Sequence, residues 1–203
     1  MSNDHPDNPE SGSQPPDPGA SSQQIQHSPT SARVPDRVSK GVFSTGLIVL
    51  QAGSEFVFDF IQRLTRPPQV AARVVVPAGM MPGLLNALRD NIQRYEAVFG
   101  SIPALAPPPA GATPAPLDQV YSDLKLADDM LSGSYANAAM ISHSQAEFCV
   151  DFITNFFPRS AVSARVYLAA AHIPNMVQTL NHAFKQFQQR IGSQPPPQRP
   201  PEV

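Results

Sequence analysis

A stretch of seven residues occurs twice in this chain. Residues 55–61, Glu-Phe-Val-Phe-Asp-Phe-Ile, return 92 positions later as residues 147–153, Glu-Phe-Cys-Val-Asp-Phe-Ile. The same offset aligns residues 41–101 with residues 133–193 without a gap. Because self-similarity at a fixed period is the signature of repeated structural units, we interpret the chain as a tandem duplication.

The local pattern within each copy predicts three strands followed by a helix. Phe56, Phe58 and Phe60 alternate with other residues, which is typical of a strand with one buried face. Apolar runs on either side predict further strands, and apolar residues at three- and four-residue spacing predict a helix that ends at a glycine. The predicted strands are 46–50, 55–61 and 71–76 in the first copy and 135–141, 147–153 and 164–168 in the second, and the predicted helices are 82–99 and 173–191.

The predicted fold class is α+β, with two tandem β-β-β-α units related by a pseudo-two-fold axis. Each antiparallel meander is expected to have one helix over its phenylalanine face. A unit of about 60 residues buries only about 60% of its unfolded surface when it folds alone. We therefore expect the two units to share a single core, as an intramolecular pseudo-dimer.

Proline separates the repeats from the rest of the chain. Of the 24 prolines, 18 lie outside the repeats, and a polar, proline-rich segment cannot offset the entropy of ordering. We therefore predict a disordered N-terminal tail at 1–37, a first repeat at 38–102, a Pro/Ala-rich linker at 103–116, a short segment plus the second repeat at 117–193, and a disordered tail at 194–203. At the start of the second repeat, residues 117–131 fit a helix and a short strand equally well.

Charge and cysteine content narrow the classes of function. The formal net charge is −2, which argues against a broadly basic nucleic-acid-binding surface. The single cysteine, Cys149, cannot form an internal disulfide and suits a reducing compartment. No apolar run approaches the ~20 residues of a membrane-spanning helix, and the polar N-terminus lacks the apolar region of a signal peptide. We therefore expect a cytoplasmic protein.

Three charged residues of the first copy, Glu55, Asp59 and Arg73, recur in the second. Asp59 and Arg73 fall on successive strands of one meander, as do Asp151 and Arg165. The favoured interpretation is a cross-strand ion pair that fixes register on the solvent-facing side; a buried pair between the copies is the alternative. Glu55 stands about 13 Å from Asp59 along a strand, too far for a glycosidase carboxylate pair, so we interpret it as a strand-end residue.

The sequence Ser142-His143-Ser144 invites a catalytic or metal-binding interpretation, because Glu147 and Cys149 follow closely. A Cys–His nucleophile also needs an orienting group and an oxyanion site, and the sequence points to neither. A metal site would need histidines from distant segments to converge without a close-ligand motif. We therefore predict no catalytic residue, no metal and no cofactor, and treat Ser142, His143 and Ser144 as a candidate binding turn.

The second copy resembles a known family. Residues 135–152 and the following Ala164-Arg165-Val166 and helix resemble the bacterial and archaeal DUF3467 family, whose single short domain has a similar YxN…ISHSxxEFxxDF strand pair, an arginine-bearing strand and a helix ending in a YExxFG-like pattern. Residues 95–100, Tyr-Glu-Ala-Val-Phe-Gly, resemble that ending in the first copy. The resemblance covers both repeats and implies a covalent version of a homodimer. It implies no activity, because the family is uncharacterised.

Two hypotheses about function follow. We expect a non-enzymatic protein-interaction or adaptor module whose strand edges, or the groove between its two helices, bind another protein. The alternative is a regulatory protein that binds a small molecule or nucleic acid in the cleft between the repeats. Neither hypothesis involves a membrane. A protein is the expected partner and nucleic acid is the less expected one. Whether the chain also forms a homo-oligomer is left open.

Overall fold

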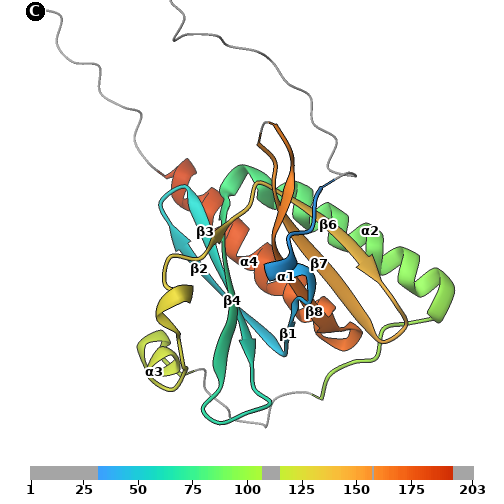
Figure 1. Cartoon of the computed structure of the whole chain (residues 1–203), viewed down its shortest axis with the longest axis horizontal. Helices are drawn as coiled ribbons and strands as arrows, with labels where there is room; N and C mark the ends of the chain where they lie inside the picture. The colour runs from blue at the N-terminus through green and yellow to red at the C-terminus, as the bar shows by residue number, and fades with distance from the viewer. Residues whose placement is uncertain (1–31, 107–114, 157, 194–203) are drawn as a thin grey trace, which may run out of the picture.

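The computed structural model describes residues 32–106, 115–156 and 158–193 (Figure 1). The predicted tails at 1–31 and 194–203, and the middle of the predicted linker at 107–114, lie outside the described residues. Residues 32–37, which were predicted to end the N-terminal tail, are part of the fold. The backbone N–H of Arg33 donates to Ser160 O, and the N–H of Val162 donates to Arg33 O, at 2.9 and 2.8 Å. These two hydrogen bonds attach the segment around Arg33 to residues 160–162 of the second repeat.

Each repeat contains the predicted three-stranded meander and helix, together with shorter elements that precede them. In the first repeat these are α1 (Asp36–Ser39), β1 (Val42–Ser44), β2 (Gly46–Ala52), β3 (Glu55–Gln62), β4 (Gln69–Pro77), η2 (Ala78–Met80) and α2 (Met81–Phe99). In the second they are α3 (Leu117–Ser122), η3 (Asp128–Met130), β5 (Ser134–Tyr135), β6 (Ala138–His143), β7 (Glu147–Thr154), β8 (Ala161–Ala169), η4 (Ala170–His172) and α4 (Ile173–Gly192).

The strands and helices form where local chemistry favours them. Alternation along β3 buries Phe56, Phe58 and Phe60 completely, as the period of two requires. Pro82 lies in the first turn of α2, where its missing N–H costs no hydrogen bond. Gly100 ends that helix with a φ of 81°, a left-handed conformation that favours glycine. The predicted helix end is therefore confirmed.

The two repeats exchange a strand. The first sheet has the order β2-β3-β4-β5, and the second sheet has the order β1-β8-β7-β6. Thus β5, from the second repeat, pairs in parallel with β4, and β1, from the first repeat, pairs in parallel with β8. Only Thr45 separates β1 from β2, so the chain passes from one sheet to the other within a single residue. This exchange was not predicted.

One core joins the repeats, as predicted. α2 lies against β6 and α4 lies against β2, so each helix reaches the edge strand of the other repeat. The ring centroids of Phe58 and Phe152 are 6.1 Å apart, and both side chains are fully buried. Tyr95 of α2 packs on Phe148 of β7, in the other repeat, with ring centroids 5.5 Å apart. The α+β fold with a joint pseudo-symmetric core is therefore confirmed, although each helix covers part of both repeats.

The symmetry extends further toward the N-terminus of each repeat than the sequence indicated. The bridge between Arg33 and Ala161 has a counterpart between Lys125 and Gln69, at the same 92-residue offset. In the same way, α1 corresponds to η3. The ambiguous segment 117–131 proves to be helical at Leu117–Ser122, and it makes its one strand-like contact at Lys125. Both open interpretations of this segment therefore hold for part of it.

The candidate binding turn is shorter than predicted. Ser142 and His143 belong to β6, because His143 pairs with Phe148 across the ladder. The turn begins at Ser144, whose backbone N–H donates to Glu147 O at 2.9 Å.

Among the described residues, no helix combines the length and the apolar character that a bilayer crossing requires.

Candidate functional site

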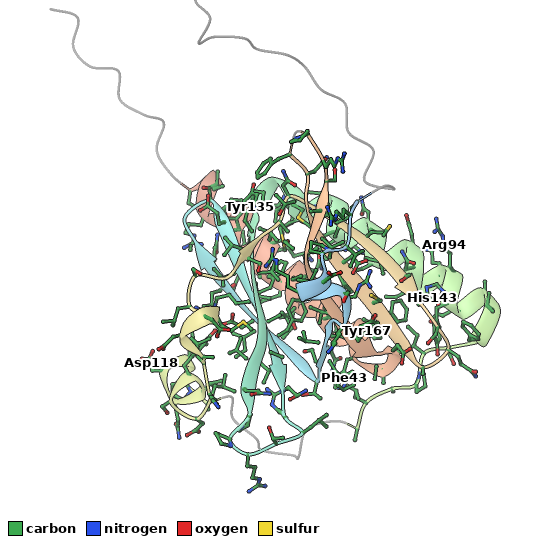
Figure 2. The ribbon with its side chains drawn as sticks, viewed as in Figure 1. Phe43, Arg94, Asp118, Tyr135, His143 and Tyr167 are labelled. Carbon is green, nitrogen blue, oxygen red and sulfur yellow. The ribbon has the colours of Figure 1, made fainter. Side chains whose placement is uncertain are left out.

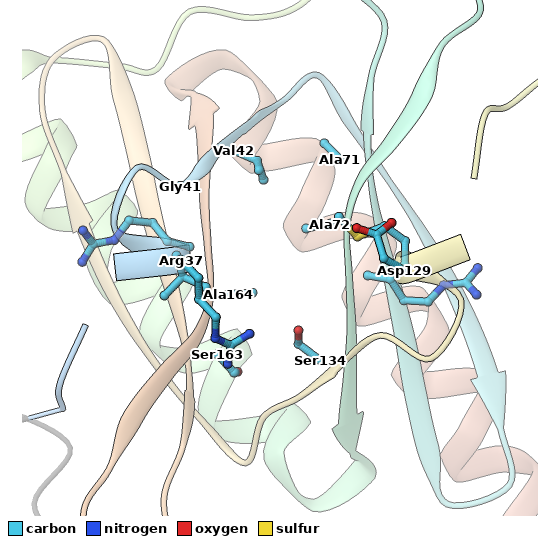
Figure 3. A pocket seen from close by; sticks show the side chains of 13 residues that line it. Arg37, Gly41, Val42, Ala71, Ala72, Asp129, Ser134, Ser163 and Ala164 are labelled. Atoms are coloured by element: carbon cyan, nitrogen blue, oxygen red, sulfur yellow. The ribbon is translucent and has the colours of Figure 1, made fainter. Parts of the chain in front are cut away.

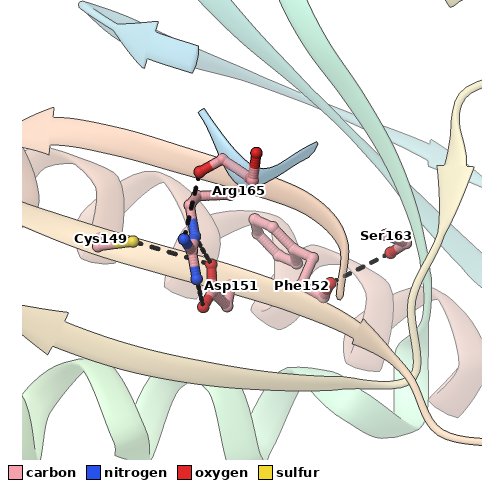
Figure 4. Close-up of polar contacts among 6 residues, drawn as sticks. Cys149, Asp151, Phe152, Ser163 and Arg165 are labelled. Atoms are coloured by element: carbon pink, nitrogen blue, oxygen red, sulfur yellow. Dashed lines mark hydrogen bonds and ion pairs between the residues drawn. The ribbon is translucent and has the colours of Figure 1, made fainter. Parts of the chain in front are cut away.

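The retained Asp–Arg pairs lie directly opposite each other on neighbouring strands. Asp59 is the register partner of Arg73, and Asp151 is the register partner of Arg165. In the first pair, Arg73 Nε and Nη2 donate to the two carboxylate oxygens at 2.7 and 2.8 Å. In the second pair, both corresponding bonds of Arg165 are 2.7 Å long (Figure 4). Such bidentate, charge-assisted geometry is both strong and directional.

The carboxylates of both pairs are buried, although the second pair lines a groove on the outer face of its sheet. The side chain of Asp59 is 0% exposed and that of Asp151 is 6% exposed, whereas their arginines retain 14% and 20% exposure. The hydrogen bonds that Arg73 donates to Asp59 raise the pKa of Arg73, and those that Arg165 donates to Asp151 raise the pKa of Arg165. Hence both guanidinium groups stay charged and each buried carboxylate keeps its counter-ion.

Each arginine also holds the exchanged segment of the other repeat. Arg73 Nη1 donates to Leu131 O at 3.1 Å, and Arg165 Nη1 donates to Ser39 O at 3.3 Å. The segment then turns at a glycine, Gly133 in one repeat and Gly41 in the other, with φ of 68° and 63°. A Cβ on Gly133 would lie 2.8 Å from Arg73 Cγ, which explains why a glycine stands there. The pairs therefore fix both the register and the strand exchange.

The two pairs differ in one further contact. The hydroxyl of Tyr121, in α3, donates to Asp59 Oδ2. Burial of the ring and this bond raise the pKa of Tyr121 above its usual range, so the phenol remains a donor. At Asp151 the additional contact is weaker, from Cys149 Sγ to Oδ1 at 3.8 Å. Tyr121 lies in the segment 117–131, which fitted a helix and a strand equally well, and no sequence pattern marked its role.

A groove lies on the outer face of the second sheet, around Asp151. It encloses about 410 Å³. Figure 2 places His143 and Tyr167 on this side of the molecule and Asp118, at the start of α3, on the opposite side. The groove residues are Met140, Ser142, His143, Ser144, Glu147, Cys149, Asp151, Arg165 and Tyr167. The groove thus brings together all three residues of the candidate binding turn and one retained pair.

Cys149 is poorly suited to act as a nucleophile. Burial and the neighbouring Asp151 raise the pKa of its thiol, which disfavours the reactive thiolate. Its cross-strand partner, Tyr167, has a raised pKa for similar reasons, burial first and Cys149 second. The groove therefore presents a neutral thiol and a neutral phenol beside a fully neutralised ion pair.

His143 is held by aromatic packing. Its ring centroid lies 5.1 Å from that of Phe148 and 5.7 Å from that of Tyr95. Its Nδ1 is buried and has no hydrogen-bond partner among the described residues, and the same holds for Gln51 Nε2, at the equivalent position of the first repeat. Because both repeats share this feature, the position beneath the helix explains it better than a catalytic role. Among the described residues, no three His, Cys, Asp or Glu side chains form a cluster that could hold a metal ion.

A second cavity lies between the repeats, on the pseudo-two-fold axis (Figure 3). It encloses about 310 Å³. Its lining consists almost wholly of residues 92 positions apart, with small side chains between the sheets and charged ones at the sides: Arg37 and Asp129, Val38 and Met130, Val42 and Ser134, Ala71 and Ser163, Ala72 and Ala164, Arg73 and Arg165, and in addition Gly41. This is the cleft that the alternative hypothesis requires.

The fold and these sites define a duplicated α+β protein with two strand-exchanged, pseudo-symmetric halves. The chain belongs to the DUF3467 family, described as proteins of unknown function, whose model matches residues 5–104 and again residues 109–193. The double match confirms the tandem duplication. A comparison with curated proteins found no match.

Proposed function

We propose that this chain is a non-enzymatic protein-interaction module, and that the groove on the outer face of the second sheet is its binding surface. One observation supports the proposal above others. Both sheets carry the same buried Asp–Arg pair, but among the described residues only the pair of the first sheet is met by a side chain from a covering helix, Tyr121 of α3. The equivalent part of the second sheet borders an open groove.

The composition of the groove suits a protein partner. Met140 is 42% exposed, and Ser142, Ser144 and Glu147 are also exposed. Methionine and tyrosine are enriched where proteins meet, and polar side chains at the edge supply hydrogen bonds. The ion pair supplies no net charge, so we expect binding that depends on shape and hydrogen bonding and changes little with salt.

The proposal is tested with a substitution in the groove and a matched one elsewhere. Met140→Glu places a charge on the surface of the groove, whereas Gln178→Glu places the same charge on the exposed side of α4. Tagged full-length chains are used to purify partners from the source cells, and partners are quantified by mass spectrometry. We expect a stoichiometric partner with the wild type and with Gln178→Glu, and its loss with Met140→Glu. Equal recovery of the partner with the wild type and with both variants would contradict the assignment of the groove as the binding surface.

A small molecule in the axial cleft is the second candidate function. The observation that favours it is the cleft itself, which opens on the pseudo-two-fold axis and has serines and arginines among its lining residues. A thermal-shift screen against metabolites and oligonucleotides tests it, because a ligand at 100 times its Kd adds about 2.7 kcal/mol to stability. Ala71→Leu, which would fill the cleft, should abolish any such shift.

Two further expectations belong to the same proposal. A cytoplasmic location rests on the single cysteine, Cys149, and fluorescence microscopy of a tagged chain tests it. A homo-oligomer would require a self-complementary surface, and light scattering over a range of concentrations measures the mass directly.

A further inference from the structure

We infer that the partner presents a tyrosine on a short helical segment, and that the hydroxyl of this tyrosine donates to Asp151. This inference rests on the proposed function, because it identifies the chemistry that the same groove recognises. It is argued from the difference between two carboxylates that occupy equivalent positions in the two repeats.

The second carboxylate lacks one donor. Asp59 Oδ2 accepts from Arg73 Nη2 and from the Tyr121 hydroxyl. Asp151 Oδ2 accepts from Arg165 Nη2, and no other donor reaches it among the described residues. A carboxylate oxygen can accept two hydrogen bonds, so the described residues leave one acceptor site of Asp151 Oδ2 open.

The open site belongs to a mostly buried side chain that still lines the groove. The side chain of Asp151 is only 6% exposed, yet it lines the groove. A hydrogen bond to a buried charged group contributes more than one to an exposed neutral group. The groove therefore favours a ligand that brings a hydroxyl donor to this oxygen.

Within the part of the chain that the structure describes, the surface around the open site is also less covered than its counterpart in the first sheet. Met140 is 42% exposed, whereas Ile48, its equivalent in the first sheet, is half-buried. In the first sheet the donor is delivered by α3, a six-residue helix. The groove of the second sheet has about 410 Å³ to receive a comparable segment.

The chain does not supply this phenol itself. It has four tyrosines. Tyr121 donates to Asp59, Tyr95 donates to Gln145 O at 2.8 Å, Tyr135 stacks on Phe156, and Tyr167 stands opposite Cys149. Pro29 occupies the position 92 residues before Tyr121. Tyr167 lines the groove itself, but no hydrogen bond joins its hydroxyl to Asp151 among the described residues. We therefore assign the tyrosine that reaches Asp151 to another polypeptide.

A peptide copied from α3 tests the inference on the full-length protein. The probe is a fluorescein-labelled peptide with the sequence of residues 115–126, and the matched control carries phenylalanine in place of its tyrosine. We expect saturable binding of the probe by fluorescence polarisation, at least about tenfold weaker binding of the control peptide, and loss of binding by Met140→Glu but not by Gln178→Glu.

Cys149 provides an independent readout, because it is the only cysteine and lines the groove. The bound probe should slow alkylation of Cys149 several-fold, and the control peptide should do so only at correspondingly higher concentration. Equal affinity of the two peptides for the protein, or absence of binding, would overturn the inference. Protection of Cys149 from alkylation by the chain's own residues 1–31 would overturn it as well. If a cellular partner is still lost with Met140→Glu in any of these cases, the groove remains the interaction surface and only the tyrosine is wrong.

Discussion

Arg73 donates a hydrogen bond to the carbonyl oxygen of Leu131, which lies 58 residues later in the chain and in the other repeat. The same guanidinium holds the buried carboxylate of Asp59 through two bonds. One side chain therefore connects a strand, its neighbour and the segment that enters the sheet from the other repeat. An equivalent set of contacts surrounds Arg165.

The first prediction concerns this pair. Arg73→Met leaves Asp59, which is 0% exposed, without its counter-ion, so we expect a loss of about 3–5 kcal/mol in the free energy of unfolding. Replacing both partners by apolar residues, in Asp59→Leu with Arg73→Met, should recover a substantial part of that loss, since no buried charge remains. Urea denaturation of the single and double variants measures both values. If the double variant were less stable than Arg73→Met alone, the packing of the two side chains, and not the unpaired charge, would account for the loss of stability.

The second prediction concerns the turn glycines. Gly133→Ala should destabilise the protein more than Gly53→Ala, although both residues have positive φ, of 68° and 61°. A Cβ on Gly53 has no atom closer than 3.8 Å, whereas one on Gly133 lies 2.8 Å from Arg73 Cγ. The left-handed conformation costs roughly 1–2 kcal/mol in both variants, and overpacking adds about 1 kcal/mol or more in Gly133→Ala. Equal melting temperatures for Gly133→Ala and Gly53→Ala would contradict the predicted overpacking of a Cβ at position 133 against Arg73.

The third prediction concerns the joint core. Phe58→Ala removes a fully buried ring that contacts Phe152 of the other repeat, and we expect a loss of about 3–5 kcal/mol. Phe156→Ala, at a ring that is 55% exposed, should cost below about 1 kcal/mol. The transition should remain single and cooperative in both variants, because the repeats share one core. Two separate transitions in calorimetry would argue for independent units.

The fourth prediction concerns acid stability. Burial, with a smaller contribution from Arg63, lowers the pKa of His172 below the ordinary histidine value of about 6.5. The unfolded chain therefore binds a proton at a higher pH than the folded one, and stability falls as the pH drops through 6.5 toward the lower folded value. His172→Gln should flatten this dependence, and His182→Gln, on the exposed side of α4, should not. If stability depended on pH in the same way in the wild type and in His172→Gln, the burial of a neutral imidazole at His172 would be contradicted.

The periodic features of the fold could be predicted from the sequence, because they recur over many residues. The phenylalanine face of β3, the helix that ends at Gly100 and the joint core all follow from alternation, helical spacing and the marginal size of one repeat. The exchanged strands could not be predicted. β1 has three residues and β5 has two, which is too short for any period to show.

The candidate site could be predicted only in part. The offset identified Asp59 and Arg73 together with their second copies, but their burial depends on segments whose position the sequence does not reveal. Gly41 and Gly133 were visible as identities, yet the reason for them is the neighbouring arginine. Tyr121 carried no signal, because its role is defined by a contact 62 residues away.

The most direct test of the central claim is site-specific photo-crosslinking in the source cells. A photoreactive phenylalanine analogue is placed at Met140, in the groove, and separately at Gln178, on α4. We predict a crosslink to another polypeptide from position 140 and none from position 178. Crosslinking that is absent at position 140, or equally strong at both positions, would contradict the assignment of the groove as the interaction surface.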